Sequence, residues 1–246
     1  EIVSRDWSSD VCSSDLYVRP VISTYLHALV DLLKEVGVDC PVLMMHSGGG
    51  IISVDIAAQF PVRLMESGPA GGALFAGEIA EKLGLGSVLS FDMGGTTAKI
   101  CLIEDAKPTT ANVFEVDRSY RFKKGSGMPI SIPVIEMVEI GAGGGSIASV
   151  DNMSQIRVGP HSAGSEPGPA CYQRGGLRPT VTDADLLLGR LDPHNFAGGA
   201  IVLDTQASGA AMLADIGSRL DLDALGCAYG LSEVVDESMA NEIGRA

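Results

Sequence analysis

The chain has 246 residues and a formal net charge of −14, from 17 basic and 31 acidic side chains. This balance disfavours a surface that binds nucleic acid or anionic lipid, since both need clustered Lys and Arg. No run of about eighteen apolar residues is present, so we expect no segment that spans a bilayer. The cysteines lack CxxC and CxH spacing, which favours reduced thiols in a cytoplasmic protein.

The first sixteen residues, EIVSRDWSSDVCSSDL, show neither a helical nor a strand period. The string DWSSDVCSSDL resembles one translated frame of a common short-read library adapter, so we interpret residues 1–16 as a non-native, adapter-derived segment. A signal peptide is the alternative, but neither its basic start nor its apolar core is present. We predict no regular element here and expect native sequence to be missing before Tyr17.

Helical periodicity predicts a helix over 17–36, with Pro20 in its first turn and Gly37 at its end. The apolar run 41–47 predicts a buried strand that leads into a glycine loop. A second helix is predicted over 67–84, because its start combines a candidate N-cap serine, Ser67, with an early proline.

Residues 87–158 alternate runs rich in Val, Ile and Leu with turns, which predicts a sheet-rich lobe. The predicted strands are SVLSFDM, TAKICLIE, NVFEVD, IPVIEMVEI, SIASV and QIRV. The next segment, 159–180, has too much Gly and Pro for a regular element, and irregular loops of that length are usually functional or disordered.

Two signals predict helices in the last part of the chain. The pattern Thr182-x-x-Asp185 resembles a capping box with Asp in place of Glu, which predicts a helix start. From Asp204 onward apolar periodicity predicts helices to the end. Residues 201–246 are therefore expected to be a helical continuation, truncated at NEIGRA.

The motif Asp-x-Gly-Gly-Thr-Thr at 92–97 stands between two predicted strands. Paired glycines permit positive φ, turn N–H groups toward one point and leave room for an anion. The carboxylate can hold a divalent cation, and the threonines add hydroxyl donors. A tight hairpin with glycine chosen only for geometry is the alternative.

Four further glycine clusters occur at 46–50, 67–72, 141–146 and 159–176, and most of the clusters follow a predicted strand. Glycine loops gathered on one side of a sheet form ligand crevices in open α/β folds. Neither GxGxxG nor GxxxxGK[ST] is present, which disfavours a dinucleotide fold and a P-loop. The hairpin turn itself offers another way to hold a nucleotide.

Five strings, ESGPAGG, FDMGGTTAKICLIED, EIGAGGGSIA, VGPHSAGSEPGPACY and PTVTDADLLLGRLDP, occur in one order between residues 17 and 246. In this order they resemble the hydantoinase A and 5-oxoprolinase family, which includes the related acetone carboxylase subunit. The resemblance implies an α/β fold with a mixed sheet over 17–200, similar to the second ATPase lobe of actin, Hsp70 and sugar kinases, followed by C-terminal helices. It also implies a fragment, since the first lobe is expected upstream.

The resemblance implies ATP-dependent hydrolysis of a cyclic amide, such as a hydantoin or 5-oxoproline, by phosphorylation of its carbonyl oxygen. ATP and Mg²⁺ are the implied cofactors, and this fragment alone is expected to bind ATP weakly and to turn over nothing. The implied residues are Asp92 for the metal and, for the nucleotide, Asp92, Gly94, Gly95, Thr96, Thr97, Gly143, Gly144 and Gly145.

Two other functions stay open at this point. One is a carboxylase subunit in which the same ATPase activates a ketone or bicarbonate, and the other is a non-catalytic nucleotide-binding subunit. The expected small-molecule substrate is thus a cyclic amide or a ketone. A second subunit of the hydantoinase B type is the expected protein partner.

Two positions depart from the commoner family pattern. Ala98 and Lys99 stand where Thr-Asp usually follows the phosphate turn, so a second carboxylate near the metal is absent or comes from elsewhere. Glu136 and Val138 stand where Asp-x-His is common, so no role of that histidine is carried over.

The strand predicted to enter GAGGG carries Glu136 and Glu139, which point to opposite faces of a strand because they are three residues apart. Glu139 is nearer to the glycines and is the candidate catalytic residue beside Asp92.

Five other polar side chains have a functional and a structural reading. His46 and His161 lie beside glycine loops, but no second ligand has metal spacing. Cys171 is more often a small buried thiol than a nucleophile. Asp183 and Asp185 are more often carboxylates that stabilise a helix start.

Overall fold

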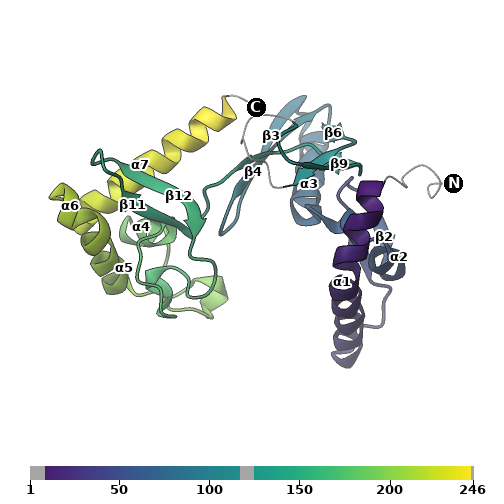
Figure 1. The fold of residues 1–246 in the computed structure, drawn as a ribbon, viewed down its shortest axis with the longest axis horizontal. Coiled ribbons are helices and arrows are strands. Elements are labelled where there is room, and N and C mark those ends of the chain that lie inside the picture. The colour runs from purple at the N-terminus through teal and green to yellow at the C-terminus, as the bar shows by residue number, and fades with distance from the viewer. Residues whose placement is uncertain (1–8, 117–124, 245–246) are drawn as a thin grey trace. The chain divides into compact units, whose positions relative to one another are not determined.

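The computed structural model describes residues 9–116 and 125–244 (Figure 1). The chain divides into two compact units. Unit 1 comprises Glu1–Ser90 and Cys101–Met137, and unit 2 comprises Phe91–Ile100 and Val138–Ala246. The division passes through the two strands that flank the 92–97 motif, so the motif itself belongs to unit 2.

Unit 1 is built on a long helix and a short hairpin. Its first elements are α1 (Ser9–Glu35), β1 (Leu43–Met45), β2 (Ile51–Ser53), α2 (Val54–Gln59), η1 (Pro61–Leu64) and α3 (Ser67–Leu83). The helix α1 packs against α2 (Figure 1). Their shared core contains Leu26, which is fully buried, with Val54, Ala57 and Ala58. Among the described residues, no helix is both long and apolar enough to cross a membrane.

The start of α1 differs from the prediction. The helix begins at Ser9, so Pro20 lies inside it rather than in its first turn, and the expectation of no regular element was wrong for residues 9–16. Tertiary contacts explain this, because Val11 is buried in an apolar cluster and Asp15 Oδ1 accepts the Val62 N–H at 2.9 Å. The remainder of the predicted adapter-derived segment, 1–8, lies outside the described residues.

The helix predicted over 67–84 is confirmed as α3, with one change at its start. Glu66 occupies the N-cap with φ 57°, so Ser67 is the first helical residue and not the cap. Gly84 ends the helix as predicted, in the left-handed region at φ 65°. Small residues of α3, Ala70 and Ala73, pack into a core with apolar side chains of the sheet.

The predicted sheet-rich segment forms a four-stranded sheet and several two-stranded ones. Its strands are β3 (Ser87–Met93), β4 (Ala98–Glu104), β5 (Lys107–Pro108), β6 (Thr110–Ala111), β7 (Phe114–Val116), β8 (Met128–Ile130), β9 (Val134–Ile135), β10 (Val138–Ile140), β11 (Ser146–Val150) and β12 (Ile156–Ser162). The largest sheet has the order β10-β4-β3, with β5 beside β4. Each strand pair with a known register is antiparallel within the described residues, so the expected mixed sheet is not found. Short connections explain this, since parallel strands need long crossovers.

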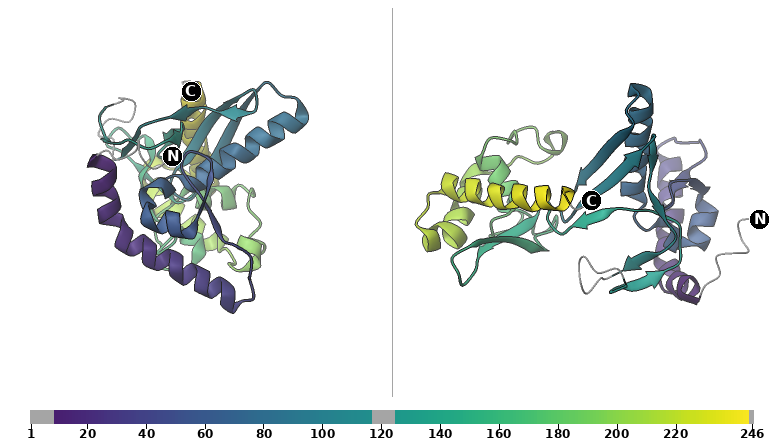
Figure 2. Two further views of the ribbon diagram at one scale, coloured as in Figure 1. Left: turned by 90° about the vertical axis from the view of Figure 1, so that its right-hand side faces the viewer. Right: turned by 90° about the horizontal axis from the view of Figure 1, so that it is seen from above.

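The helices of unit 2 are η2 (Ala170–Tyr172), α4 (Val181–Leu187), η3 (Ala197–Gly199), α5 (Thr205–Met212), the π-helical η4 (Leu213–Gly217), α6 (Ser218–Leu220) and α7 (Ala224–Ile243). Of these, α4, η4 and α7 contact the β11–β12 hairpin. The helix α7 lies along β12 and packs on α4 (Figure 2). Leu231 of α7, Met212 and Ile216 are fully buried there beside Ile140. The helices predicted after Asp204 are therefore confirmed to Ile243.

The N-cap of α4 lies two residues before the predicted one. The N-cap is Thr180, whose side chain accepts the Asp183 N–H while Asp183 accepts the Thr180 N–H, a complete capping box. The predicted pair, Thr182 and Asp185, has the same spacing, so spacing alone does not distinguish the two registers. The segment predicted to be irregular from 159 onward is also shorter, because β12 continues to Ser162.

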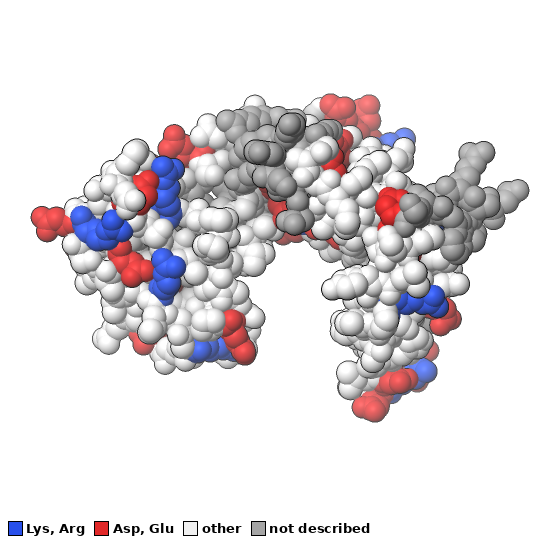
Figure 3. Space-filling view, viewed as in Figure 1, with Lys and Arg blue, Asp and Glu red and all other residues white. Residues whose placement is uncertain are grey.

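Charged side chains of both signs lie next to one another on unit 2 (Figure 3). Ion pairs among them include Arg157 to Asp151 at 2.9 Å, Arg178 to Asp215 at 3.2 Å and Arg190 to Asp185 at 3.0 Å. All three are partly exposed, so each contributes about 0–1 kcal/mol to stability.

The two glycines that follow α3 provide a matched test of backbone strain. A Cβ at Gly84 or at Gly86 would meet no described atom within 4 Å, but only Gly84 has positive φ. We expect Gly84→Ala to lower the free energy of unfolding by about 1 kcal/mol, and Gly86→Ala to change it by less than about 0.5 kcal/mol. Denaturant titration followed by circular dichroism measures both, and equal costs would contradict the assigned C-cap.

Candidate functional site

The 92–97 motif forms a tight, exposed turn between β3 and β4. The Gly94 N–H donates to the Thr97 carbonyl at 2.9 Å, and residues 92–96 are exposed. Neither glycine has positive φ, so the predicted conformational reason for glycine was wrong. The protein's own packing does not require glycine here either, because a Cβ at Gly95 would meet no described atom within 4 Å, and at Gly94 it would meet only the Thr97 oxygen at 3.7 Å. The turn is therefore open where its glycines stand.

A second glycine loop, 141–146, holds the turn from behind. The Gly144 N–H donates to the Gly94 carbonyl at 3.0 Å, and the Gly145 N–H donates to the Gly95 carbonyl at 2.6 Å. A Cβ at Gly143 would lie 2.7 Å from backbone atoms of Gly94 and Thr96, so this contact requires glycine. The two glycine motifs that the sequence singled out separately thus meet through their backbones.

These contacts fix the direction of the turn's own donors. In a trans peptide the C=O and the N–H point in opposite directions. The Gly94 and Gly95 carbonyls point at the glycine loop, so the N–H groups of Gly95 and Thr96 point away from it. Neither N–H donates to an acceptor among the described residues. Two adjacent outward N–H groups of this kind form a concave site that suits an anion.

The N–H groups of the second loop have a different use. Those of Gly144 and Gly145 bond the turn, and the Gly143 N–H donates to Ser146 Oγ at 2.8 Å. Because all three bonds are internal, the loop acts as a support for the turn. Ser146 is a residue that sequence reasoning missed, although a hydroxyl directly after a glycine run is a usable signal for such an anchor.

Asp92 and Glu139 both lie near the turn, and Lys99 lies between their strands. Lys99 and Glu139 are directly paired across β4 and β10, with Nζ 3.8 Å from Oε1. The 94–97 turn joins two strands of equal length, which places Asp92 opposite Lys99 on the other side of β4. Glu136 lies between β9 and β10, so the prediction that it shares a strand with Glu139 was wrong.

The residues around the turn fit a magnesium–phosphate group better than a protein-only metal site. No cluster of three or more His, Cys, Asp or Glu that suits a metal occurs among the described residues. Asp92 is exposed near the end of β3, two residues before the first glycine of the turn. Mg²⁺ commonly takes one or two carboxylates and completes its shell with water and phosphate oxygens. One carboxylate beside an anion site is consistent with that chemistry.

One of the two histidine candidates, His46, lies outside the unit that contains this turn. His46 belongs to unit 1, where its Nδ1 accepts the Gly48 N–H at 3.0 Å, and burial with the nearby Arg63 lowers the pKa of its ring. The imidazole is therefore neutral at neutral pH and stabilises the glycine loop after β1. His161 is exposed on β12.

Asp183 is the centre of a buried hydrogen-bond network, which confirms its structural reading. It is fully buried, and its carboxylate accepts five hydrogen bonds: from the N–H groups of Ala170 at 3.2 Å, Cys171 at 2.8 Å and Thr180 at 3.0 Å, and from the hydroxyls of Thr180 and Ser208, each at 2.7 Å. Asp185 instead pairs with Arg190 near the surface.

Cys171 is unsuited to act as a nucleophile. Its side chain is fully buried, and burial together with the adjacent Asp183 carboxylate raises the pKa of its thiol far above the usual range. The nucleophilic form of cysteine is the thiolate, which this environment suppresses. The structural reading of Cys171 is therefore favoured.

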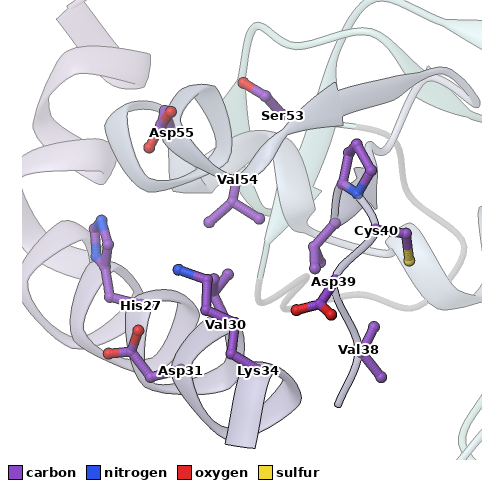
Figure 4. A pocket seen from close by; sticks show the side chains of 12 residues that line it. His27, Val30, Asp31, Lys34, Val38, Asp39, Cys40, Ser53, Val54 and Asp55 are labelled. Carbon is purple, nitrogen blue, oxygen red and sulfur yellow. The ribbon is translucent and has the colours of Figure 1, made fainter.

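Unit 1 has a pocket of about 580 Å³ that contains none of the predicted site residues (Figure 4). The C-terminal half of α1 forms one wall, and the start of α2 with the segment after α1 forms the other. Its lining side chains include His27, Asp31, Lys34, Asp39 and Asp55. The His27 Nδ1 lies 2.7 Å from the Ser23 carbonyl of its own helix, which engages that nitrogen locally.

The contact between the two glycine motifs can be tested by adding one methyl group. Gly143→Ala forces Cβ into the turn's backbone, so we expect a loss of about 1–3 kcal/mol in the free energy of unfolding. Gly95→Ala is the matched control, and we expect a change of less than about 0.5 kcal/mol because that Cβ faces open space. Both values come from denaturant titration, and a harmless Gly143→Ala would refute the contact.

The Asp183 network predicts a large stability effect. Asp183→Ala leaves five donors without their acceptor, so we expect the free energy of unfolding to fall by about 3 kcal/mol or more. Asp31→Ala removes an exposed carboxylate of α1 and should change it by less than about 0.5 kcal/mol. Thermal and denaturant unfolding measure both variants, and similar midpoints would argue against the network.

Known proteins resemble this chain over nearly its whole length. The sequence profile of the hydantoinase/oxoprolinase family matches residues 12–246. "Uncharacterized protein MJ0964" of Methanocaldococcus jannaschii is 38% identical over 92% of this chain and 34% of its own length. The caprolactamase subunit alpha of Pseudomonas jessenii is 35% identical over 93% of this chain and 32% of its own.

Solved structures give the same result. The nucleotide-free structure of an acetone carboxylase matches with a TM-score of 0.76 and 32% identity, over 89% of this chain and 29% of that one. The ATP-dependent caprolactamase of P. jessenii matches with a TM-score of 0.66. The chain thus spans about a third of the length of these relatives. With a family profile that covers 12–246, this chain belongs to the hydantoinase/oxoprolinase family.

Proposed function

We propose that this chain provides the ATP-binding part of an enzyme that acts on a cyclic amide of the hydantoin or 5-oxoproline type. The observation that carries the proposal is the outward direction of the Gly95 and Thr96 N–H groups on an exposed turn beside Asp92. Such donors suit the oxygens of a polyphosphate. In this proposal the Thr96 and Thr97 hydroxyls complete the phosphate contacts, and Gly94 serves the nucleotide by leaving room where a side chain would stand.

Charge near the turn explains the proposed need for Mg²⁺. The carboxylates of Asp92 and Glu139 outnumber the single ammonium of Lys99, so these three side chains leave one net negative charge. This negative charge repels an approaching polyphosphate unless a divalent cation offsets the charge of the phosphate and of the carboxylates. We assign Asp92 as the carboxylate that would hold this cation, directly or through water.

Glu139 is the second catalytic residue in the proposal. Its side chain is 56% exposed, which leaves it accessible to a substrate, and Lys99 lies 3.8 Å away to orient it. Bound ATP would supply the phosphoryl group that makes a lactam carbonyl a better electrophile. Gly143, Gly144 and Gly145 then serve the nucleotide by holding the turn, through the hydrogen bonds described above.

The whole protein's architecture and partners belong to the proposal. We assign the turn to the second lobe of an ATPase similar to actin, Hsp70 and sugar kinases, with the first lobe supplied elsewhere in a longer polypeptide. A hydantoinase B-type subunit is the proposed partner, and the description of the caprolactamase relative as a subunit alpha supports it. In this proposal the enzyme is cytoplasmic, in keeping with its scattered thiols.

A carboxylase is the second candidate function. Of the two solved structures named above, that of the acetone carboxylase has the higher TM-score, which favours this reading. In it, the same ATP site would activate a ketone or bicarbonate. ATP hydrolysis by the full-length protein with its partner, measured over a panel of lactams and ketones with and without bicarbonate, separates the two functions. Bicarbonate-dependent turnover would reject the amide hydrolase.

The role of Asp92 predicts a large kinetic effect. In the full-length protein we expect Asp92→Asn to lower Mg²⁺-dependent ATP turnover by about two orders of magnitude or more, because a charge that stabilises the transferring group is lost. Asp221→Asn is the control, since Asp221 is exposed in unit 2 and its φ of 55° suits Asn. Unchanged turnover in Asp92→Asn would contradict the metal role. The isolated chain is expected to show no turnover at all.

A further inference from the structure

The carbonyl of Gly144 accepts two hydrogen bonds from one residue outside the glycine loop. Thr182 donates to it through its backbone N–H at 2.8 Å and through Oγ1 at 2.8 Å. Thr182 is 7% exposed, so water competes little for this acceptor. Both lone pairs of the carbonyl are thus occupied by the first turn of α4.

A continuous chain of hydrogen bonds, the relay, leads from Thr182 to the open turn. Thr182 donates to the Gly144 carbonyl, and the N–H of the same peptide unit, from Gly145, donates to the Gly95 carbonyl. The N–H of that next peptide unit belongs to Thr96 and points outward. Successive hydrogen bonds through peptide units polarise one another, by about 10–30% per bond. The Thr96 N–H is the last donor of this relay.

The hydroxyl of Thr182 is not needed to cap α4. Thr180 and Asp183 already form the capping box, and the Asp183 carboxylate fixes that box to η2 and α5. Thr182 therefore stands on a rigid, buried helix start while its hydroxyl points at the glycine loop. Three successive glycines have large backbone freedom, so an external anchor is what holds their peptide units in one orientation.

We propose that Thr182 is a positioning residue for the nucleotide, because its hydroxyl sets the direction of the Thr96 N–H through the relay. The inference rests on the proposed function for its ligand, but the relay itself exists without nucleotide. Among the described residues, no hydrogen bond links Thr182 directly to residues 92–97. The Thr182 hydroxyl therefore affects how well ordered the turn is and how strongly its Thr96 N–H donates.

Substitutions of Thr182 in the full-length protein test this role. Thr182→Val keeps the shape and removes the hydroxyl, whereas Thr182→Ser keeps the hydroxyl. Thr24→Val is the matched control, since its exposed hydroxyl donates to the Pro20 carbonyl at 2.9 Å in unit 1. We expect Thr182→Val to weaken MgATP binding by about three- to tenfold in calorimetry, and the other two variants to stay within about twofold.

Hydrogen exchange without nucleotide provides an independent measurement. We expect Thr182→Val to speed exchange of the Gly144 and Gly145 amides by about three- to tenfold, with little change in the Thr182→Ser protein. Unchanged exchange in Thr182→Val, or equal effects of Val and Ser, would overturn the positioning role. If Thr182→Val does not fold, Thr182→Ala is measured in its place against the same limits.

The two proposals fail in different ways. A wild-type protein that binds no MgATP contradicts the proposed function, and exchange alone then decides on the relay. A wild-type protein that binds MgATP, with exchange raised but affinity unchanged in Thr182→Val, overturns the link from Thr182 to the nucleotide.

Discussion

The candidate site depends on two backbone hydrogen bonds, from the Gly144 and Gly145 N–H groups to the Gly94 and Gly95 carbonyls. They hold an exposed turn whose two glycines have no side chains that could fix it. Because each carbonyl is engaged on one side, the N–H of the same peptide unit is directed to the other side. Geometry that serves an anion is thus created by contacts on the opposite face of the turn.

In unit 2 the groups proposed to bind the ligand are exposed, whereas the groups that support them are buried. The donors proposed to meet the ligand are exposed, so water satisfies them without a large cost in the free protein. The supporting groups are buried and fully paired, above all the Asp183 carboxylate with its five donors. Cys171 illustrates the same division, since the environment that makes the thiol a good structural group also keeps it protonated. The groups proposed to take part in the reaction therefore lie on the exposed turn and its flanking strands.

Lys99 changes the electrostatics of the turn relative to the commoner family pattern. It is largely buried, at 13% side-chain exposure, and pairs with Glu139 across the sheet. A lysine in this place offsets carboxylate charge rather than adding to it. Of the two carboxylates near the turn, Glu139 is thus paired with Lys99, and Asp92 is the one available to a cation. This agrees with the lack of any larger ligand cluster among the described residues.

The sequence by itself determined the family, the helix that ends at Gly84, the helices after Asp204 and the glycine turn, because these follow from local periodicity and contiguous motifs. Tertiary structure decided those features for which a local pattern allows more than one answer. Helix α1 extends back to Ser9 because of contacts with distant residues, and two equally spaced Thr–Asp pairs compete for one cap. Above all, a glycine has no side chain from which the hydrogen-bond partner of its backbone could be predicted. Whether its N–H supports the protein or faces a ligand is decided only by which backbone it meets.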